Sequence, residues 1–264
     1  MNADLRVALR TRSLAYPDGF ATWEVCETRE TWPAGKTSLV LCDVWDRHTC
    51  SGAEVRLERM VPRMSEVVER LRGKGVLVIH APSDTMAYYE GTPARQRAQE
   101  APQDAALTVM TGEERSKEDP PQPLDQSEAC DTCPDEQHPK FEKGMPYPWT
   151  RQHAGVRVDQ ERDAVSADGR EHMALCRQRG IEHILLMGVH TNMCIMRRTF
   201  SIKQMVKWGM QIALIRDLTD TMYNPAKPPY VSHDEGTQLT IEYIEKFWCP
   251  TVTSDQLLGV TFPS

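Results

Sequence analysis

The sequence predicts an α/β protein in which a doubly wound parallel sheet is covered by helices on both faces. Short apolar runs typical of buried strands alternate along the chain with amphipathic stretches typical of helices. Glycines follow several of the helical stretches, as expected where a helix ends before the next strand. The 264 residues carry a formal net charge of −7 and are 40% hydrophobic, an ordinary composition for a globular protein.

The first part of the chain predicts one strand–helix–strand unit. Residues 1–36 are polar without a sustained period, and we expect them to form a surface extension of a main domain at 37–264. The apolar run at 37–43 predicts a central parallel strand, because such strands are buried on both faces. An amphipathic pattern predicts a helix over 54–72, and a second strand follows at 76–79.

An irregular segment separates this unit from the rest of the chain. Residues 119–149 contain seven prolines among charged and small polar residues, and they predict a proline-rich insertion over about 100–150. The alternation then resumes. The predicted elements are strands at 155–158, 183–189, 211–217 and 251–254, and helices at 166–179, 191–208 and 234–247.

Composition and missing motifs exclude several classes of function. The 38 acidic residues outnumber the 31 Lys and Arg, which argues against nucleic acid, because phosphate binding needs clustered basic residues. No apolar run reaches the ~20 residues of a membrane span, and residues 1–16 lack a secretory signal, so we expect a cytoplasmic protein without membrane association. No glycine-rich phosphate-binding motif or G-x-S-x-G elbow follows a strand, which argues against dinucleotide, P-loop and serine-hydrolase sites.

The candidates for chemistry are polar residues just beyond the strand ends, where doubly wound sheets bind ligands. In GVHTNMC a strand leads directly into a helix, which places Cys194 in the first helical turn. The helix dipole there is expected to lower the pKa of Cys194, and the amides of Met193 and Cys194 could hold an oxyanion. Asp43, at the end of the first strand, is the acid expected to move the proton. The alternative is a packing role for Cys194 and a capping role for Asp43.

The segments SLVLCDVWD and GVHTNMC resemble the two motifs of the isochorismatase-like cysteine hydrolases, which include nicotinamidases and N-carbamoylsarcosine amidohydrolase. The similarity covers about residues 37–255, interrupted by the insertion. It implies a three-layer fold with a six-stranded parallel sheet in the order 3-2-1-4-5-6. It also implies that Cys194 attacks an amide-like substrate to form a thioester, that Asp43 is the catalytic acid, and that a cis peptide precedes His190.

The third catalytic residue of that superfamily, a lysine, has no match here. Asp159 aligns with it, and Arg151 and Arg157 are the candidates to replace it. A guanidinium can orient a carboxylate and stabilise an oxyanion, but it does not readily give up a proton. We therefore expect a C–N hydrolase with an arginine in the lysine's electrostatic role. Two alternatives stay open: a non-catalytic ligand-binding or interaction module of the same fold, and vinyl-ether hydrolysis of the isochorismatase type, which needs no thiol.

The remaining candidates concern substrate, metal and partners. Small-molecule pockets mix aromatic and polar groups, and the substrate-binding candidates are Trp45, His48, His80, Trp149, Thr191, Asn192 and Tyr223. No cofactor is expected. No metal is expected either, because only His80 and Asp84 follow the second strand; the weak alternative is the set of Cys130, Cys133 and His138, which lacks a fourth ligand. The eight cysteines are not typical of a disulfide framework in so long a chain, and the resemblance implies a homo-oligomer.

Overall fold

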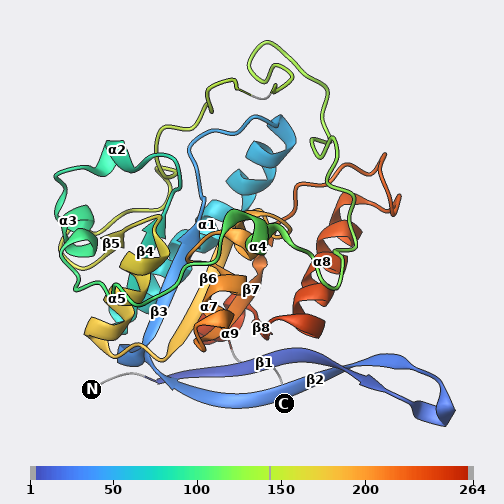
Figure 1. Cartoon of the computed structure of the whole chain (residues 1–264), viewed down its shortest axis with the longest axis horizontal. Helices are drawn as coiled ribbons and strands as arrows, with labels where there is room; N and C mark the ends of the chain where they lie inside the picture. The colour runs from blue at the N-terminus through green and yellow to red at the C-terminus, as the bar shows by residue number, and fades with distance from the viewer. Residues whose placement is uncertain (1–3, 143, 261–264) are drawn as a thin grey trace.

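The computed structural model describes residues 4–142 and 144–260, and its centre is a mostly parallel sheet between two layers of helices (Figure 1). Residues 1–3 and 261–264, the outer ends of the two predicted regions, lie outside the described residues, as does residue 143 of the insertion. The strands are β1 Asp4–Ala15, β2 Thr22–Pro33, β3 Thr37–Cys42, β4 Leu77–Ala81, β5 Ala164–Val165, β6 His183–Val189, β7 Gln211–Asp220 and β8 Thr251–Val252.

The parallel part of the sheet confirms the predicted strand order. Among the described residues, eight strands lie in the order β2-β1-β8-β7-β6-β3-β4-β5. The last six of these are parallel, and counted along the chain from β3 they have the order 3-2-1-4-5-6 read from the β5 edge. β3 is central, pairs with β4 and β6, and is buried along its whole length. The strand order reverses between β3 and β6, where a doubly wound sheet binds its ligand.

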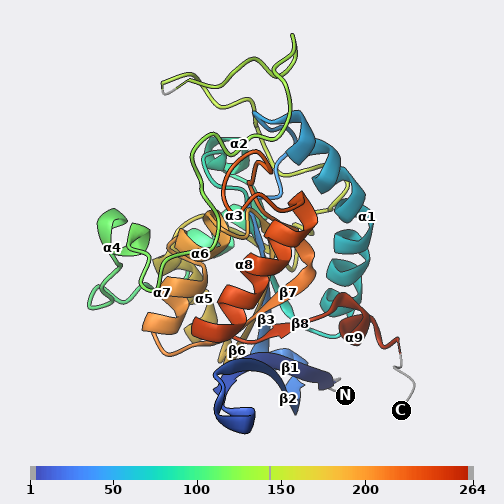
Figure 2. The same ribbon diagram turned by 90° about the vertical axis from the view of Figure 1, so that its right-hand side faces the viewer.

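Helices cover both faces of the sheet (Figure 2). The longer ones are α1 Ser51–Gly73, α5 Gly169–Arg179 and α8 His233–Phe247; the shorter ones are η1 Pro17–Gly19, η2 Ala34–Lys36, α2 Met86–Tyr89, α3 Pro93–Gln99, α4 Gly112–Ser116, α6 Cys194–Arg197, α7 Ile202–Lys207 and α9 Ser254–Leu258. Leu39 and Leu41 of β3 pack with α1 and α9 on one face, and Val40 packs with α5, α7 and α8 on the other. No helix in the described ranges is long and apolar enough to cross a membrane.

The predicted N-terminal extension is a β-hairpin that widens the sheet. β1 and β2 pair antiparallel over 12 residues each, and β1 also pairs with β8, the last strand of the parallel part of the sheet. Leu5, Val7 and Leu9 lie in the same core cluster as the α1 face of the sheet. The only sequence pattern for this hairpin is the alternation of apolar and polar residues at Leu5, Val7 and Leu9. It is short because most of the hairpin is exposed and polar.

Two further predictions were wrong. Residues 155–158 form a loop, and the third parallel strand is β5, whose two residues are too few to produce a pattern. The single helix expected over 191–208 is two helices, α6 and α7, because the backbone at Arg198 is extended. The insertion is irregular apart from the short helix α4, as the prolines predicted; α2 and α3 lie before it in the sequence. It passes over the carboxyl ends of the parallel strands (Figure 1).

Candidate active site

Asp43 follows the central strand, and its carboxylate is fully buried. A φ of 51° at Asp43 turns the chain sharply out of β3. One carboxylate oxygen accepts a hydrogen bond from the amide of Ser83 (2.8 Å), and the other accepts from Nε of Arg198 (2.9 Å). These two bonds fix the orientation of the carboxylate. The positive charge of Arg198 compensates for the negative charge buried at Asp43.

Cys194 is half-buried, and its thiol is close enough to the Asp43 carboxylate for that charge to act on its pKa. Burial raises the pKa of Cys194 well above its usual range, and Asp43 raises it further through its charge and a hydrogen bond. Arg198 and the amide of His190 oppose this shift without outweighing it. This direction is opposite to the predicted lowering by the helix dipole, because burial and the charge of Asp43 act on the thiol; α6 itself is only four residues long. Burial and the charge of Asp43 therefore favour the thiol over the thiolate at Cys194.

Arg198 is the cation beside Asp43, and the sequence reasoning missed it. Its Nη2 also donates to the carboxylate of Asp84 (3.1 Å), and its side chain is 30% exposed. Burial alone would lower the pKa of Arg198, but Asp43 and Cys194 together raise it above its ordinary value. The amide of Arg198 donates to the carbonyl of Cys194 (3.0 Å), so the two residues lie one helical turn apart. An arginine four residues after the candidate nucleophile was the available signal.

The two arginines expected to replace the lysine lie away from this cluster. Arg157 has a side chain 60% exposed and pairs with Glu69 (3.3 Å). Arg151 donates a hydrogen bond to the hydroxyl of Tyr88 (2.8 Å). Over the part of the chain that the structure describes, neither guanidinium contacts Asp43.

The loop from β6 into α6 supplies backbone amides near the thiol. The peptide bond between Val189 and His190 is cis, as the resemblance implied. The amide of Met193 donates to the carbonyl of His190 (3.0 Å), so this predicted oxyanion donor is already engaged. The amide of Cys194 has no acceptor among the described residues and remains as the candidate donor.

Two neutral histidines connect this loop to the segment after β3. The amide of Cys50 donates to Nδ1 of His48 (3.0 Å), so His48 carries its proton on Nε2 and donates it to Nε2 of His190 (3.1 Å). Burial lowers the pKa of His48 to about 4 and that of His190 to about 3, which keeps both rings neutral near pH 7. The Nδ1–H of His190 is buried without an acceptor among the described residues.

Aromatic rings extend from His48 into the insertion. Trp149 stacks on Trp45 with ring centroids 4.1 Å apart, and its other neighbour in the stack is Tyr147 at 4.2 Å. The ring of His48 lies 5.7 Å from that of Trp149. The Trp45 indole donates to the carbonyl of Ser83, the residue whose amide holds Asp43. Three of the predicted substrate-binding residues, His48, Trp45 and Trp149, are therefore brought together near the candidate active site.

The other four predicted substrate-binding residues brace the fold. Their polar side-chain atoms bond within the protein at 2.7–2.9 Å: His80 to Asp163 and Gln152, Thr191 to Thr219, Asn192 to Met222, and Tyr223 to Lys227. Both ring nitrogens of His80 are engaged and the side chain is fully buried, so His80 has no polar atom left for a ligand.

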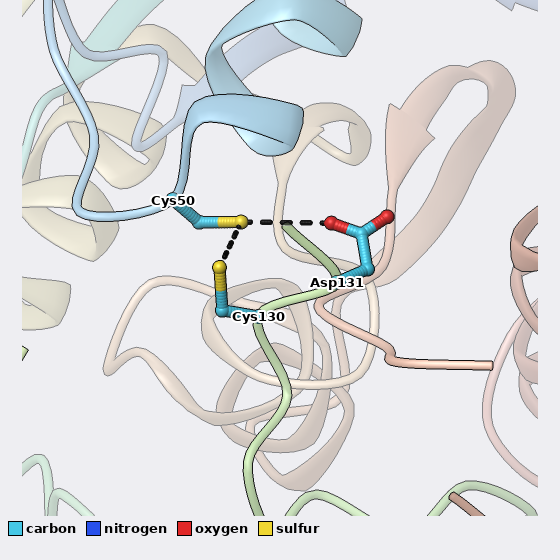
Figure 3. A group of neighbouring side chains, drawn as sticks. All are labelled: Cys50, Cys130 and Asp131. Atoms are coloured by element: carbon cyan, nitrogen blue, oxygen red, sulfur yellow. Dashed lines mark hydrogen bonds between the residues drawn. The ribbon is translucent and has the colours of Figure 1, made fainter. Parts of the chain in front are cut away.

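The alternative metal set of Cys130, Cys133 and His138 is not assembled among the described residues. The sulfur of Cys130 lies 2.6 Å from that of Cys50, Cys133 is exposed, and His138 pairs with Glu54 (3.0 Å). Cys50 and Cys130 instead gather with Asp131, and the potential ligand atoms of these three residues lie within 4.8 Å of one another (Figure 3). The sequence pattern C-x2-C-x4-H therefore does not describe the group that forms.

Comparison with known proteins identifies the fold. No protein-family model and no curated protein matches the chain. A cysteine hydrolase from Pseudomonas syringae pv. phaseolicola 1448A matches with a TM-score of 0.50 at 12% identity, over 86% of this chain and 92% of that one. An isochorismatase family protein from Burkholderia thailandensis gives 0.46 at 16% identity over 85% and 95%, and N-carbamoylsarcosine amidase from Thermoplasma acidophilum gives 0.41 at 14% identity over 83% and 97%. The predicted isochorismatase-like fold is confirmed.

Proposed function

We propose that this chain, which has the isochorismatase-like fold, is a cysteine hydrolase that cleaves a C–N bond in a small amide-like molecule. The observation that supports this most is the buried Asp43 carboxylate, which accepts a hydrogen bond from the guanidinium of Arg198 (2.9 Å) and whose charge acts on the thiol of Cys194. A thiol that attacks a carbonyl at neutral pH needs a base within hydrogen-bonding reach. We assign this role to Asp43, whose charge acts on the thiol of Cys194.

The proposed reaction has two halves with the proton carried by Asp43. The sulfur of Cys194 attacks the carbonyl carbon while Asp43 accepts the thiol proton, and the amide of Cys194 stabilises the oxyanion. Asp43 then gives the proton to the leaving nitrogen, the C–N bond breaks, and an acyl thioester remains. Water attacks the thioester with Asp43 again as the base, and the thiol and the carboxylic acid product are released.

Arg198 supplies a fixed positive charge where the superfamily has a lysine. Its guanidinium holds one oxygen of Asp43 and offsets the buried negative charge, so the carboxylate keeps its orientation during the proton transfers. Because a guanidinium does not readily lose a proton, every proton transfer in this mechanism passes through Asp43.

A screen of small primary amides and N-carbamoyl compounds for ammonia release tests the proposal. We expect the wild-type protein to turn over at least one compound, and Cys194→Ala and Asp43→Asn each to lose about 10³-fold or more in kcat/KM. Cys26→Ala is the matched control, because Cys26 lies in the hairpin at the opposite end of the parallel strands. It should keep wild-type activity.

Two results would contradict the proposal. A folded wild-type protein without turnover of any compound would favour the non-catalytic module. Amide turnover that survives in Cys194→Ala would show that the thiol is not the nucleophile.

A further inference from the structure

We infer that Cys50 and Cys130 are a redox modification site, at which a disulfide fastens the insertion to the first turn of α1. The two residues are 80 positions apart in the sequence, yet their sulfur atoms lie 2.6 Å apart and point toward each other (Figure 3). Cys50 immediately precedes α1 and is buried, whereas Cys130 belongs to the insertion and is half-buried. The inference does not depend on the proposed hydrolase activity.

The insertion is fitted closely to α1 around this pair. The hydroxyl of Thr132 lies 3.5 Å from the sulfur of Cys50 and 3.4 Å from that of Cys130. A Cβ atom at Gly52 would come within 2.7 Å of the Asp131 carboxylate and 2.9 Å of the Thr132 methyl group. Residues 130–132 therefore lie directly against the start of α1. These contacts keep the two sulfurs facing each other.

A zinc ion is the competing use of these sulfurs, and the geometry opposes it. Tetrahedral zinc binds sulfur at about 2.3 Å, which places two thiolates about 3.7 Å apart, well beyond the 2.6 Å between these sulfurs. Asp131, the third potential ligand, already accepts a hydrogen bond from Arg56 (2.8 Å), and that positive charge repels a dication. A disulfide between Cys50 and Cys130 therefore fits these side chains better than a zinc ion does.

The cross-link would reach the candidate active site through the backbone of Cys50. Its amide holds His48, and His48 donates to His190 in the loop that carries Cys194. On the other side, the carbonyl of Cys130 accepts a hydrogen bond from Asn224 (3.1 Å) in the segment between β7 and α8. Oxidation would therefore fasten the insertion covalently to the segment before α1, and the existing hydrogen bond from Asn224 would connect the same insertion residue to the segment between β7 and α8.

The oxidation requires a two-electron acceptor, and we infer a small disulfide such as oxidised glutathione. The thiolate of Cys130, the more exposed partner, attacks one sulfur of glutathione disulfide and releases one glutathione thiol. Cys50 loses its proton and attacks the mixed disulfide at Cys130, which releases the second glutathione. Two cysteine thiols are oxidised and one glutathione disulfide is reduced.

Peptide mapping of the full-length protein across glutathione buffers tests the inference. Free thiols are alkylated, the protein is digested, and cross-linked peptides are sequenced by mass spectrometry. We expect a Cys50–Cys130 cross-link to dominate at oxidising ratios and to disappear at reducing ratios. Cys133→Ser, which changes the neighbouring exposed thiol, should retain the cross-link, and Cys130→Ser should abolish it.

Three outcomes would overturn the inference. One is a Cys130–Cys133 disulfide in place of the cross-link, and another is full alkylation of Cys50 at the most oxidising ratio. The third is a stoichiometric zinc ion in the dialysed wild-type protein that is lost in Cys50→Ser. If a variant does not fold, the wild-type map and zinc content still decide between these outcomes.

Discussion

Arg198 joins two acidic residues of the candidate site, Asp43 and Asp84, and its charge lies at the boundary between the buried carboxylate and solvent. The Asp43 carboxylate is fully buried, so its charge would be uncompensated without this partner. The residue therefore contributes to stability as well as to the proposed reaction.

Replacement of Arg198 by Met should lower both stability and activity. Removing one partner of a buried ion pair costs about 3–5 kcal/mol, and the 30% exposure of Arg198 reduces our expectation to about 1–3 kcal/mol. Arg198→Lys should recover part of both, because it keeps the charge but loses the planar fork. Urea unfolding and turnover check this. Arg157→Met is the control, and an equal loss in that variant would contradict a specific role for Arg198.

His233 makes the stability depend on pH on the alkaline side. Burial alone would lower the pKa of His233, but the hydrogen bonds that its ring donates to the carboxylates of Asp131 and Asp220 outweigh burial and raise the pKa to about 9. The unfolded value is about 6.5, so this stabilisation is complete below pH 6.5 and is lost as the pH rises through 9. It amounts to at most about 3 kcal/mol.

His233→Gln should remove that dependence. We expect the free energy of unfolding of the wild type to fall between pH 6 and pH 9.5 more steeply than that of the variant, measured by urea unfolding at several pH values. Parallel curves for the two proteins would show that His233 is not protonated in the folded state near neutral pH.

At the scale of elements, the hairpin of β1 and β2 is part of the hydrophobic core. Leu5 is 1% exposed and packs in the cluster on the α1 face of the sheet, whereas Val25 of β2 is 51% exposed. Leu5→Ala should therefore lower the free energy of unfolding by about 2–4 kcal/mol, and Val25→Ala by less than about 0.5 kcal/mol. Urea unfolding measures both. Equal, small effects would mean that the hairpin does not contribute to the cooperative core.

The elements that the sequence predicts well are those with a complete local pattern. β3 is a continuous apolar run and α1 has a full helical period, and both lie within a few residues of their predicted bounds. β5 has two residues and the hairpin buries few of its side chains, so neither produces a readable period. The helix after β6 is interrupted at Arg198, where the backbone is extended and the side chain contacts Asp43, a tertiary contact that no local propensity encodes.

At the scale of the whole molecule, the candidate site and the cysteine pair depend on contacts between distant segments. Asp43 and Arg198 are 155 positions apart, and Cys50 and Cys130 are 80 apart. The motifs predicted that Asp43 and Cys194 belong together, because parallel strands bring their carboxyl ends to one edge of the sheet. No comparable topological rule places the residues of the irregular insertion, so the sequence could not predict that Cys130 lies beside Cys50. The homo-oligomer implied by the resemblance stays a prediction.

The most direct test of the nucleophilic role of Cys194 is the mass of the protein during turnover. An amide that the screen identifies as a substrate is mixed with the protein, the reaction is quenched in acid, and the intact mass and peptide map are measured. We predict an added mass equal to the acyl part of the substrate, located on Cys194, absent from Cys194→Ala and formed more slowly in Asp43→Asn. Turnover without any adduct on Cys194, or an adduct of the same size in Cys194→Ala, would contradict the proposed mechanism.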